Sequence, residues 1–226
     1  MKPPHKLDRT RQAAPQVFER LREMIVSLEL APGTVLSRAE LAERFQVSQT
    51  PVRDALMQLG QEGLVDIFPQ HATLVSRIHL PSAQQAHFLR CAIELEVVRT
   101  LALDDDDAIV AKLRAQVDLQ AALAGGEPEE FIAADHAFHR MMYVAAGAPD
   151  LYDLVRRMSG HIDRLRRLDL PSDGKAKRVV RDHRRIVDAI AKRAPEAAQE
   201  ALREHLSGTL GRVDDIRERF PDYVTA

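Results

Sequence analysis

The sequence predicts a mainly α-helical protein in two parts: three helices with a small β-hairpin, then an all-α antiparallel helical bundle. Three observations support this. Apolar residues recur three and four positions apart over most of the chain. Residues 64–76 are instead rich in β-branched and large apolar residues. The chain has 226 residues, 45% of them hydrophobic, which is enough for two folded domains.

Composition excludes several protein classes. Charged residues make up 29% of the chain, an ordinary globular value that excludes extensive disorder. The single cysteine, Cys91, cannot form a disulfide within one chain and indicates a reducing compartment. No secretory signal is visible, and no apolar run reaches the roughly 18 residues of a membrane helix. We therefore expect a cytoplasmic protein that does not enter the membrane.

The first elements follow from helix-capping signals. Residues 1–14 have the character of a flexible polar arm, and a helical pattern begins at Gln16. Ser37 can cap a second helix, with Glu40 three residues later completing a capping box. Ser48 is a good N-cap for a third helix.

A change of period follows the third helix. Residues 64–68 and 73–76 have strand composition, and residues 69–72 separate them as a turn, which predicts a β-hairpin. Three helices followed by a hairpin form a winged helix-turn-helix, which we place at residues 15–78. Residues 79–82 are predicted to be a linker.

The remaining chain, residues 83–220, is helical throughout. Glycine and proline breaks divide it into six predicted helices, which indicates an antiparallel bundle. We expect Arg164, Arg166 and Arg167 to form a solvated basic face there, the alternative being that one of them lines the effector pocket. The predicted helices are 83–103, 106–124, 128–146, 150–168, 173–193 and 195–219.

The third helix is the element expected to read duplex DNA. Its first turn offers Gln49, Thr50 and Arg53, which suit adenine, a base edge or phosphate, and guanine. Taken alone, a residue such as Gln49 or Arg53 is more often a solvated surface residue of a helix. The net charge of −2 gives no support, so the argument rests on pattern and position. The predicted DNA contacts are Arg38, Arg44, Ser48, Gln49, Thr50, Arg53 and His71.

This first part resembles the DNA-binding domain of the GntR regulators. It departs from that family at Gln49, where many members have Arg, and at Ala72, where many have Gly in the wing turn. The resemblance implies a transcription regulator rather than an enzyme. One such module reads few base pairs, so we expect a homodimer on an inverted-repeat operator in double-stranded DNA. The matching segments are Leu30–Leu36, Leu41–Phe45, Val47–Leu56 and Glu62–Val65.

Four polar residues occupy predicted core positions of the bundle. Asp135 and His139 are four apart on one helix face, and His183 and His205 lie in apolar stripes of two later helices. Each alone could be a core side chain with a hydrogen-bond partner. Burying a carboxylate without a partner costs several kcal/mol, on the order of 5. A divalent metal would satisfy all four groups, and this set suits zinc or nickel. His136 is expected to face away.

The bundle resembles the FCD ligand-binding domain of the FadR-like GntR subfamily. The resemblance is carried by the spacing from Asp135 to His139 and by the surroundings of His183 and His205. It implies that these four residues bind a metal ion and that the domain binds a small organic acid effector.

Arg90 and Glu94 are the predicted effector-binding residues. In relatives an Arg at this place is commonly near the effector pocket, and a guanidinium group suits a carboxylate. The alternative is a simple salt bridge between residues four apart on one helix.

We therefore expect a sequence-specific transcription regulator, acting as a repressor, whose operator affinity depends on a carboxylate metabolite bound near a metal. One alternative is a metal-dependent hydrolase on a helical bundle, which would leave the winged helix-turn-helix without a role. Another is an architectural DNA binder without an effector, which would leave the inward Asp and His residues unexplained.

Overall fold

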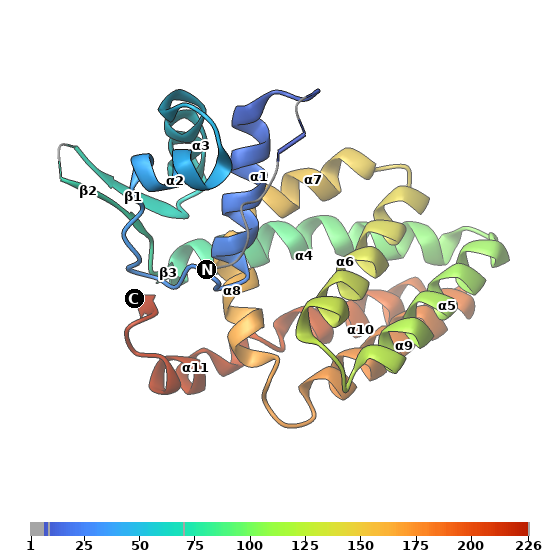
Figure 1. The fold of residues 1–226 in the computed structure, drawn as a ribbon. Helices are drawn as coiled ribbons and strands as arrows, with labels where there is room; N and C mark the ends of the chain where they lie inside the picture. Colours follow the sequence, from blue (N-terminus) through green and yellow to red (C-terminus); the bar gives the residue numbers. More distant parts are fainter. Residues whose placement is uncertain (1–6, 9, 70, 226) are drawn as a thin grey trace. The chain divides into compact units, whose positions relative to one another are not determined.

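The computed structural model describes residues 7–8, 10–69 and 71–225 (Figure 1). Residues 1–6 and 9 of the predicted arm lie outside the described residues. The chain forms two compact units. The N-terminal unit contains the described residues up to Ala83, together with Gly160–Arg164 and the residues from Arg217 onward. The C-terminal unit contains Gln84–Ser159 and Leu165–Ile216. Each unit has its own apolar core.

Three helices form the first part of the N-terminal unit: α1 (Ala13–Val26), α2 (Arg38–Phe45) and α3 (Gln49–Gln61). The predicted cap of α2 is confirmed, because the Ser37 side chain accepts a hydrogen bond from the Glu40 amide at 3.3 Å. Ser48 occupies the N-cap position of α3, but its side chain makes no capping hydrogen bond. The apolar faces of the three helices meet at Val17, Leu21, Met24, Ile25, Leu41, Phe45, Val52, Leu56 and Leu59.

The predicted hairpin is confirmed. Strands β1 (Val65–Phe68) and β2 (Ala72–Val75) pair in antiparallel register, with Val65 opposite Val75. A second, unpredicted pair forms between β3 (Ile78–His79) and β4 (Val224–Thr225), which run parallel. Strands of two residues are too short to produce a recognisable alternation in the sequence.

A buried arginine lies in the N-terminal unit. Arg164, in the first turn of α8 (Gly160–Asp169), is fully buried. It donates to the Ser76 carbonyl at 2.7 Å, and its Nη2 lies 2.9 Å from His161 Nδ1. Burial lowers the pKa of Arg164 to about 10. The prediction of a solvated face was wrong for this residue, because Ser76, its acceptor, lies 88 residues away in the chain.

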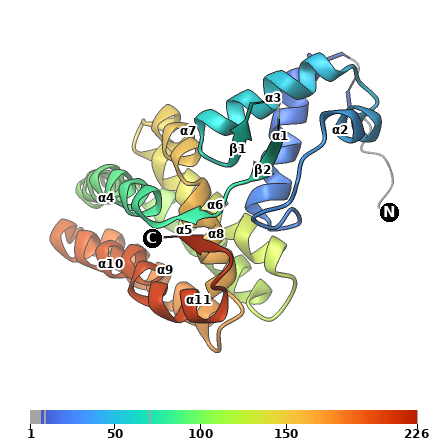
Figure 2. The same ribbon diagram turned by 90° about the vertical axis from the view of Figure 1, so that its left-hand side faces the viewer.

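The C-terminal unit is entirely helical in its described part, which confirms the predicted bundle. Figures 1 and 2 show α9 and α10 side by side. The helices are α4 (Leu80–Leu103, counted here from Gln84), α5 (Asp107–Leu123), α6 (Pro128–Ala145), α7 (Pro149–Met158), the second half of α8, α9 (Lys175–Ala191), α10 (Pro195–Ser207), the 3-10 turn η1 (Leu210–Arg212) and α11 (Val213–Arg219, counted here to Ile216).

The structure differs from the predicted boundaries at three places. The expected helix 150–168 is two helices, α7 and α8, which meet at Ser159 and Gly160. The expected helix 195–219 ends at Ser207 and continues as η1 and α11. Residues 79–82, expected to be a linker, are the end of β3 and the first turn of α4. Proline is tolerated in a first helical turn, so Pro81 does not prevent this start.

Within the described part of the chain, no helix is both long enough and apolar enough to cross a lipid bilayer.

We predict that Gly160→Ala destabilises the protein. A Cβ atom at Gly160 would lie 2.6 Å from Cδ2 of Leu64, which is fully buried and therefore has little freedom to move. Overpacking of this kind costs about 1–3 kcal/mol. Urea unfolding of the purified chain should show this loss. Gly125→Ala is the matched control, because a Cβ at Gly125 meets nothing within 4 Å. Equal stability of the two variants would contradict the packing argument.

Candidate metal centre and DNA-reading helix

Asp135, His139, His183 and His205 come together inside the C-terminal unit. Helix α6 carries the first two residues, α9 carries His183 and α10 carries His205. One possible ligand atom from each residue lies within 4.8 Å of the others. The Nε2 atom of His183 lies 3.3 Å from Nε2 of His205 and 3.6 Å from Oδ1 of Asp135. Two nitrogens that share one tetrahedral zinc ion stand about 3.3 Å apart, so this spacing fits a metal.

The protonation states of the cluster also fit a metal. Burial alone would raise the pKa of Asp135, but Arg166 and the three imidazoles outweigh it and hold that pKa well below its usual value. Burial lowers the pKa of His183 to about 3 and the pKa of His205 well below its usual range. A charged carboxylate and neutral imidazoles are the forms that bind divalent ions.

An unpartnered nitrogen inside the cluster gives an independent test of the fit. His139 is 2% exposed, and within the described residues its Nε2 atom has no hydrogen-bond partner. Within the described residues, the Nδ1 atom of His205 is also buried without a hydrogen-bond partner. A buried polar atom left without a partner costs about 1–3 kcal/mol. Coordination of a metal by His139 would remove this cost, so the residues present suit an ion.

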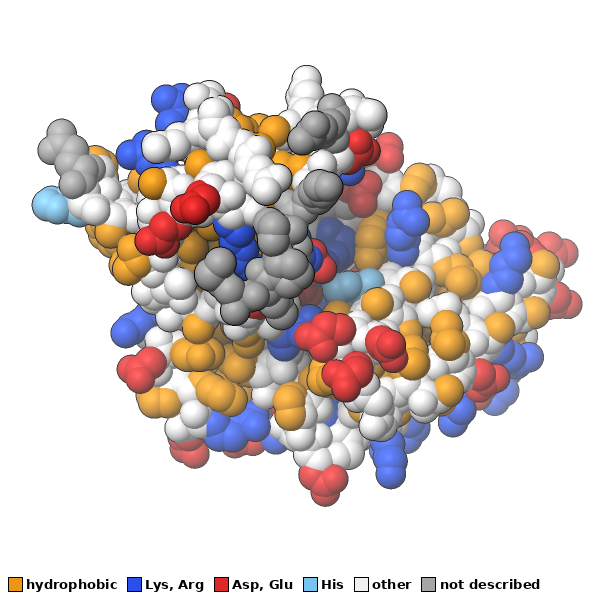
Figure 3. All heavy atoms as spheres, viewed as in Figure 1, with side chains coloured by type: hydrophobic (Ala, Val, Ile, Leu, Met, Phe, Trp, Pro, Cys, Tyr) orange, Lys and Arg blue, Asp and Glu red, His pale blue; other side chains and the backbone are white. Residues whose placement is uncertain are grey.

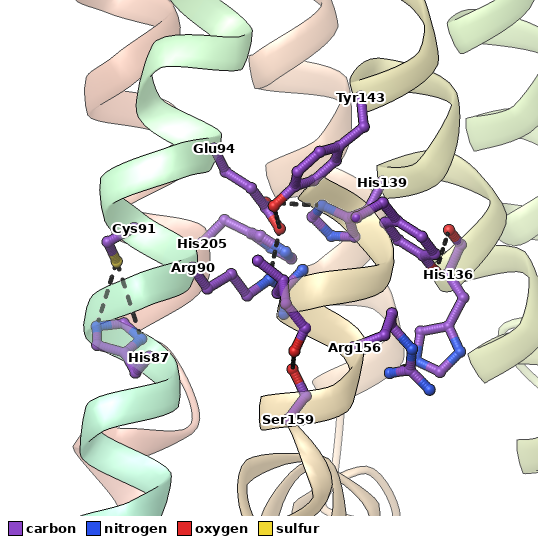
Figure 4. A network of polar contacts seen from close by, with 12 residues as sticks. His87, Arg90, Cys91, Glu94, His136, His139, Tyr143, Arg156, Ser159 and His205 are labelled. Atoms are coloured by element: carbon purple, nitrogen blue, oxygen red, sulfur yellow. Dashed lines mark hydrogen bonds and ion pairs between the residues drawn. The ribbon is translucent and has the colours of Figure 1, made fainter. Parts of the chain in front are cut away.

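Glu94 and Arg90, the predicted effector contacts, lie next to this cluster. Figure 4 shows Glu94 of α4 directed at His139, with an Oε2 to Nδ1 distance of 3.0 Å. Its Oε1 accepts from Arg90 at 2.7 Å and from the Tyr143 hydroxyl at 3.4 Å. Burial would raise the pKa of Glu94, but Arg90 and His139 outweigh it and lower the pKa to about 2. The salt bridge that the sequence offered as an alternative is therefore present.

Two residues of the cluster were missed by sequence reasoning. Gln120 of α5 is fully buried and contacts both His183 and Asp135. Its signal is a polar residue on an apolar stripe, following Leu113 and Val117 at helical spacing. Arg166 was expected in a solvated face. Its Nη2 instead lies 2.6 Å from Oδ2 of Asp135.

His136 lies outside the cluster, as its position one residue off the stripe predicts. Its Nε2 atom is 3.0 Å from Nη1 of Arg156 (Figure 4). It is not part of the group whose ligand atoms converge.

The seven predicted DNA contacts are on the surface of the N-terminal unit. Arg44 is half-buried and lies 3.3 Å from Glu29. Arg53 is 62% exposed, with its Nε 3.6 Å from Asp54. On the face shown in Figure 3, acidic and basic side chains are interspersed and form no continuous basic stripe. The exposed members of the predicted set are Arg38, Ser48, Gln49, Thr50, Arg53 and His71.

Comparison with known protein families identifies both units. Residues 13–75 match the model of the gntR family of bacterial regulatory proteins, and residues 85–208 match the FCD domain. A relative from Streptomyces ambofaciens, an HTH-type transcriptional regulator in an unstable DNA locus, is 37% identical over 91% of this chain and 87% of its own length. The HTH-type transcriptional repressor RspR of Escherichia coli K12 is 29% identical over 97% of this chain and 96% of its own.

Solved structures share the same fold. Escherichia coli McbR/YncC superposes with a TM-score of 0.74, covering 93% of this chain and 99% of its own, at 19% identity. A putative GntR regulator from Rhodococcus sp. RHA1 reaches a TM-score of 0.72 at 21% identity, covering 88% of this chain and 97% of its own.

The family and the names of the relatives indicate regulation of transcription rather than catalysis, so the hydrolase alternative is set aside. The chain belongs to the GntR family of bacterial regulatory proteins, in which it is a DNA-binding transcriptional regulator with an FCD domain.

Proposed function

We propose that this regulator is a metal-containing repressor whose affinity for its operator is set by a small carboxylate bound beside the metal. The observation that carries the proposal is the buried convergence of Asp135, His139, His183 and His205. These residues would hold a divalent ion, zinc or nickel being the best suited to one carboxylate and three imidazoles. The ion would act as a charged anchor for an effector.

Charge balance supports a carboxylate effector. The cluster contains two carboxylates, Asp135 and Glu94, and two guanidinium groups, Arg90 and Arg166, so these charges cancel. A bound divalent ion would add two positive charges in a buried place. An anionic ligand on the ion would offset that charge, which is costly to leave unpaired. Arg90 and Arg166 are the side chains proposed to hold the free end of such an acid.

The DNA-binding half of the proposal rests on the exposed start of α3. A helix N-terminus that carries Gln49, Thr50 and Arg53 in water is free to enter the major groove. We propose a homodimer on an inverted repeat, because one module of this size contacts too few base pairs for specificity. The repressor assignment follows the name of the Escherichia coli relative RspR. We propose that the protein acts in the cytoplasm, where the DNA that it would bind is found.

We predict that Arg53→Ala weakens operator binding about 5- to 150-fold, the equivalent of about 1–3 kcal/mol for a lost contact to guanine. The operator is first selected from random duplexes with the wild-type protein. Gel-shift titration then compares the wild type and the variant on that duplex and on an unrelated one. A contact to a base lowers affinity for the operator more than for the unrelated duplex.

The matched control is Arg99→Ala, which removes an exposed arginine of α4 whose partner is Glu96 on the same helix. Its operator affinity should equal that of the wild type. If Arg53→Ala also binds with unchanged affinity, Arg53 has no part in recognition.

We predict that His139→Ala lowers the metal content of the purified protein well below one equivalent per chain, because one of the four ligands is lost. His136→Ala is the matched control on the same helix, three residues away and directed at Arg156. It should retain the wild-type metal content. Elemental analysis after exposure to zinc or nickel and gel filtration measures both variants.

Circular dichroism establishes that each variant is folded before the comparison. A wild-type protein that holds neither zinc nor nickel after this treatment would refute the metal centre.

We predict that one or more small carboxylic acids raise the melting temperature of the metal-loaded protein. A ligand that binds only the folded state must stabilise it, by about 2.7 kcal/mol at one hundred times its Kd. A thermal-shift screen of hydroxy acids and sugar acids, run with and without added metal, tests this. Acids that stabilise both forms equally would show that the metal is not the anchor.

A further inference from the structure

We propose that Gln120 and Glu94 are positioning residues of the metal centre. Each would fix the tautomer of one histidine ligand, so that the Nε2 lone pairs of His183 and His139 face the ion. This inference rests on the metal centre proposed above. It assigns roles that the sequence did not suggest, since Gln120 was not singled out and Glu94 was expected to contact the effector.

The orientation of Gln120 follows from the chemistry of its two neighbours. Its Nε2 lies 3.4 Å from Oδ1 of Asp135, and an ionised carboxylate can only accept a hydrogen bond. The amide nitrogen must therefore face Asp135, which leaves Oε1 to face His183 at 2.7 Å from Nδ1. Because Oε1 can only accept, Nδ1 of His183 must carry the proton. The Nε2 atom of a neutral His183 then has a free lone pair.

Glu94 contacts His139 at ion-pair distance, without the hydrogen-bond geometry that Gln120 has with His183. Its Oε1 is taken by donors from Arg90 and Tyr143, and its Oε2 lies 3.0 Å from Nδ1 of His139. A charged carboxylate this close to Nδ1 of His139 favours a proton on that nitrogen over a lone pair, because it can only accept. The Nε2 atom of His139, which is buried without a hydrogen-bond partner, is then the one presented to the ion. A carboxylate behind a histidine ligand also makes the imidazole a stronger donor to the metal.

His205 provides a contrast within the same cluster. Among the described residues its Nδ1 atom, like Nδ1 of His139, has no hydrogen-bond partner, and unlike Nδ1 of His139 it has no carboxylate at ion-pair distance. The two fixed imidazoles come from α6 and α9, and the residues that fix them come from α4 and α5. The orientation of the Nε2 atoms of His139 and His183 therefore depends on residues from four helices. Outer residues of this kind typically contribute 10- to 100-fold, in order of magnitude, to metal affinity.

The first experiment measures zinc affinity of the full chain by competition with a chromophoric chelator. Gln120→Leu removes the acceptor for His183 at nearly constant volume and should weaken zinc binding about 10- to 100-fold. Gln120→Glu restores the acceptor for His183 but not the donor to Asp135, so it should recover part of the affinity. Gln116→Leu is the matched control on the same helix. Gln116 donates to the backbone carbonyl of Ala134 at 2.9 Å and contacts no proposed ligand, so its loss should leave zinc affinity unchanged.

A second variant tests the proposed role of Glu94, and its result does not depend on whether Gln120→Leu folds. Glu94→Gln preserves shape, but an amide has one acceptor oxygen and cannot serve both Arg90 and His139. Zinc affinity should again fall about 10- to 100-fold.

The tautomers themselves can be observed in the metal-free protein by ¹⁵N NMR of labelled histidine. The wild type should show His183 and His139 protonated at Nδ1, and Gln120→Leu should give a mixture at His183. A merely structural role for Gln120 would lower the melting temperature without changing this signal.

The outcomes separate the two proposals. A wild-type protein that binds neither zinc nor nickel overturns both the metal centre and this inference. A wild type that binds zinc, with Gln120→Leu and Glu94→Gln at wild-type affinity, overturns this inference alone. Wild-type histidines protonated at Nε2 would also overturn it.

Discussion

The charge of Asp135 is the constraint on which the C-terminal unit depends. A carboxylate that is 3% exposed keeps its charge only if positive or hydrogen-bonding groups surround it. Arg166, Gln120 and His183 reach it from α8, α5 and α9, so those helices must be placed to satisfy one side chain. The surrounding apolar core makes no such directional demand, because the hydrophobic effect has no direction.

Much of the fold was predictable from the sequence because it depends on local patterns. The apolar period located the helices, and the change of period located the hairpin. The four ligands were predictable because each is polar at an inward position. Gln120 carried the same signal and could have been found by it. Arg164 and Arg166 could not, since an arginine on a polar helix gives no indication that its acceptors are buried groups elsewhere in the chain.

The difference between the predicted and the observed helix boundary near Gly160 also involves a residue that is distant in the sequence. Nothing near Gly160 in the sequence marks it as the end of a helix more strongly than other glycines. Gly160, the first residue of α8, has the side chain of Leu64 within 2.6 Å of the position that a Cβ would occupy, and Leu64 lies far from it in the sequence. The polar residues at the start of α3 and those of the bundle cluster have opposite surroundings. Those of α3 face water, where they remain free to bond a partner, whereas those of the bundle bond one another.

The parallel pairing of β3 with β4 affects the order in which parts of the chain can fold during translation. Thr225 lies 147 residues after Ile78, its partner, so this strand pair cannot form when Ile78 leaves the ribosome. At a synthesis rate of about 5–20 residues per second, roughly 7–30 seconds pass between the synthesis of Ile78 and that of Thr225. The helices α1 to α3 can fold in that interval, but β3 keeps an open edge until translation reaches residue 225. The DNA-binding unit is therefore completed only after the whole bundle has been made.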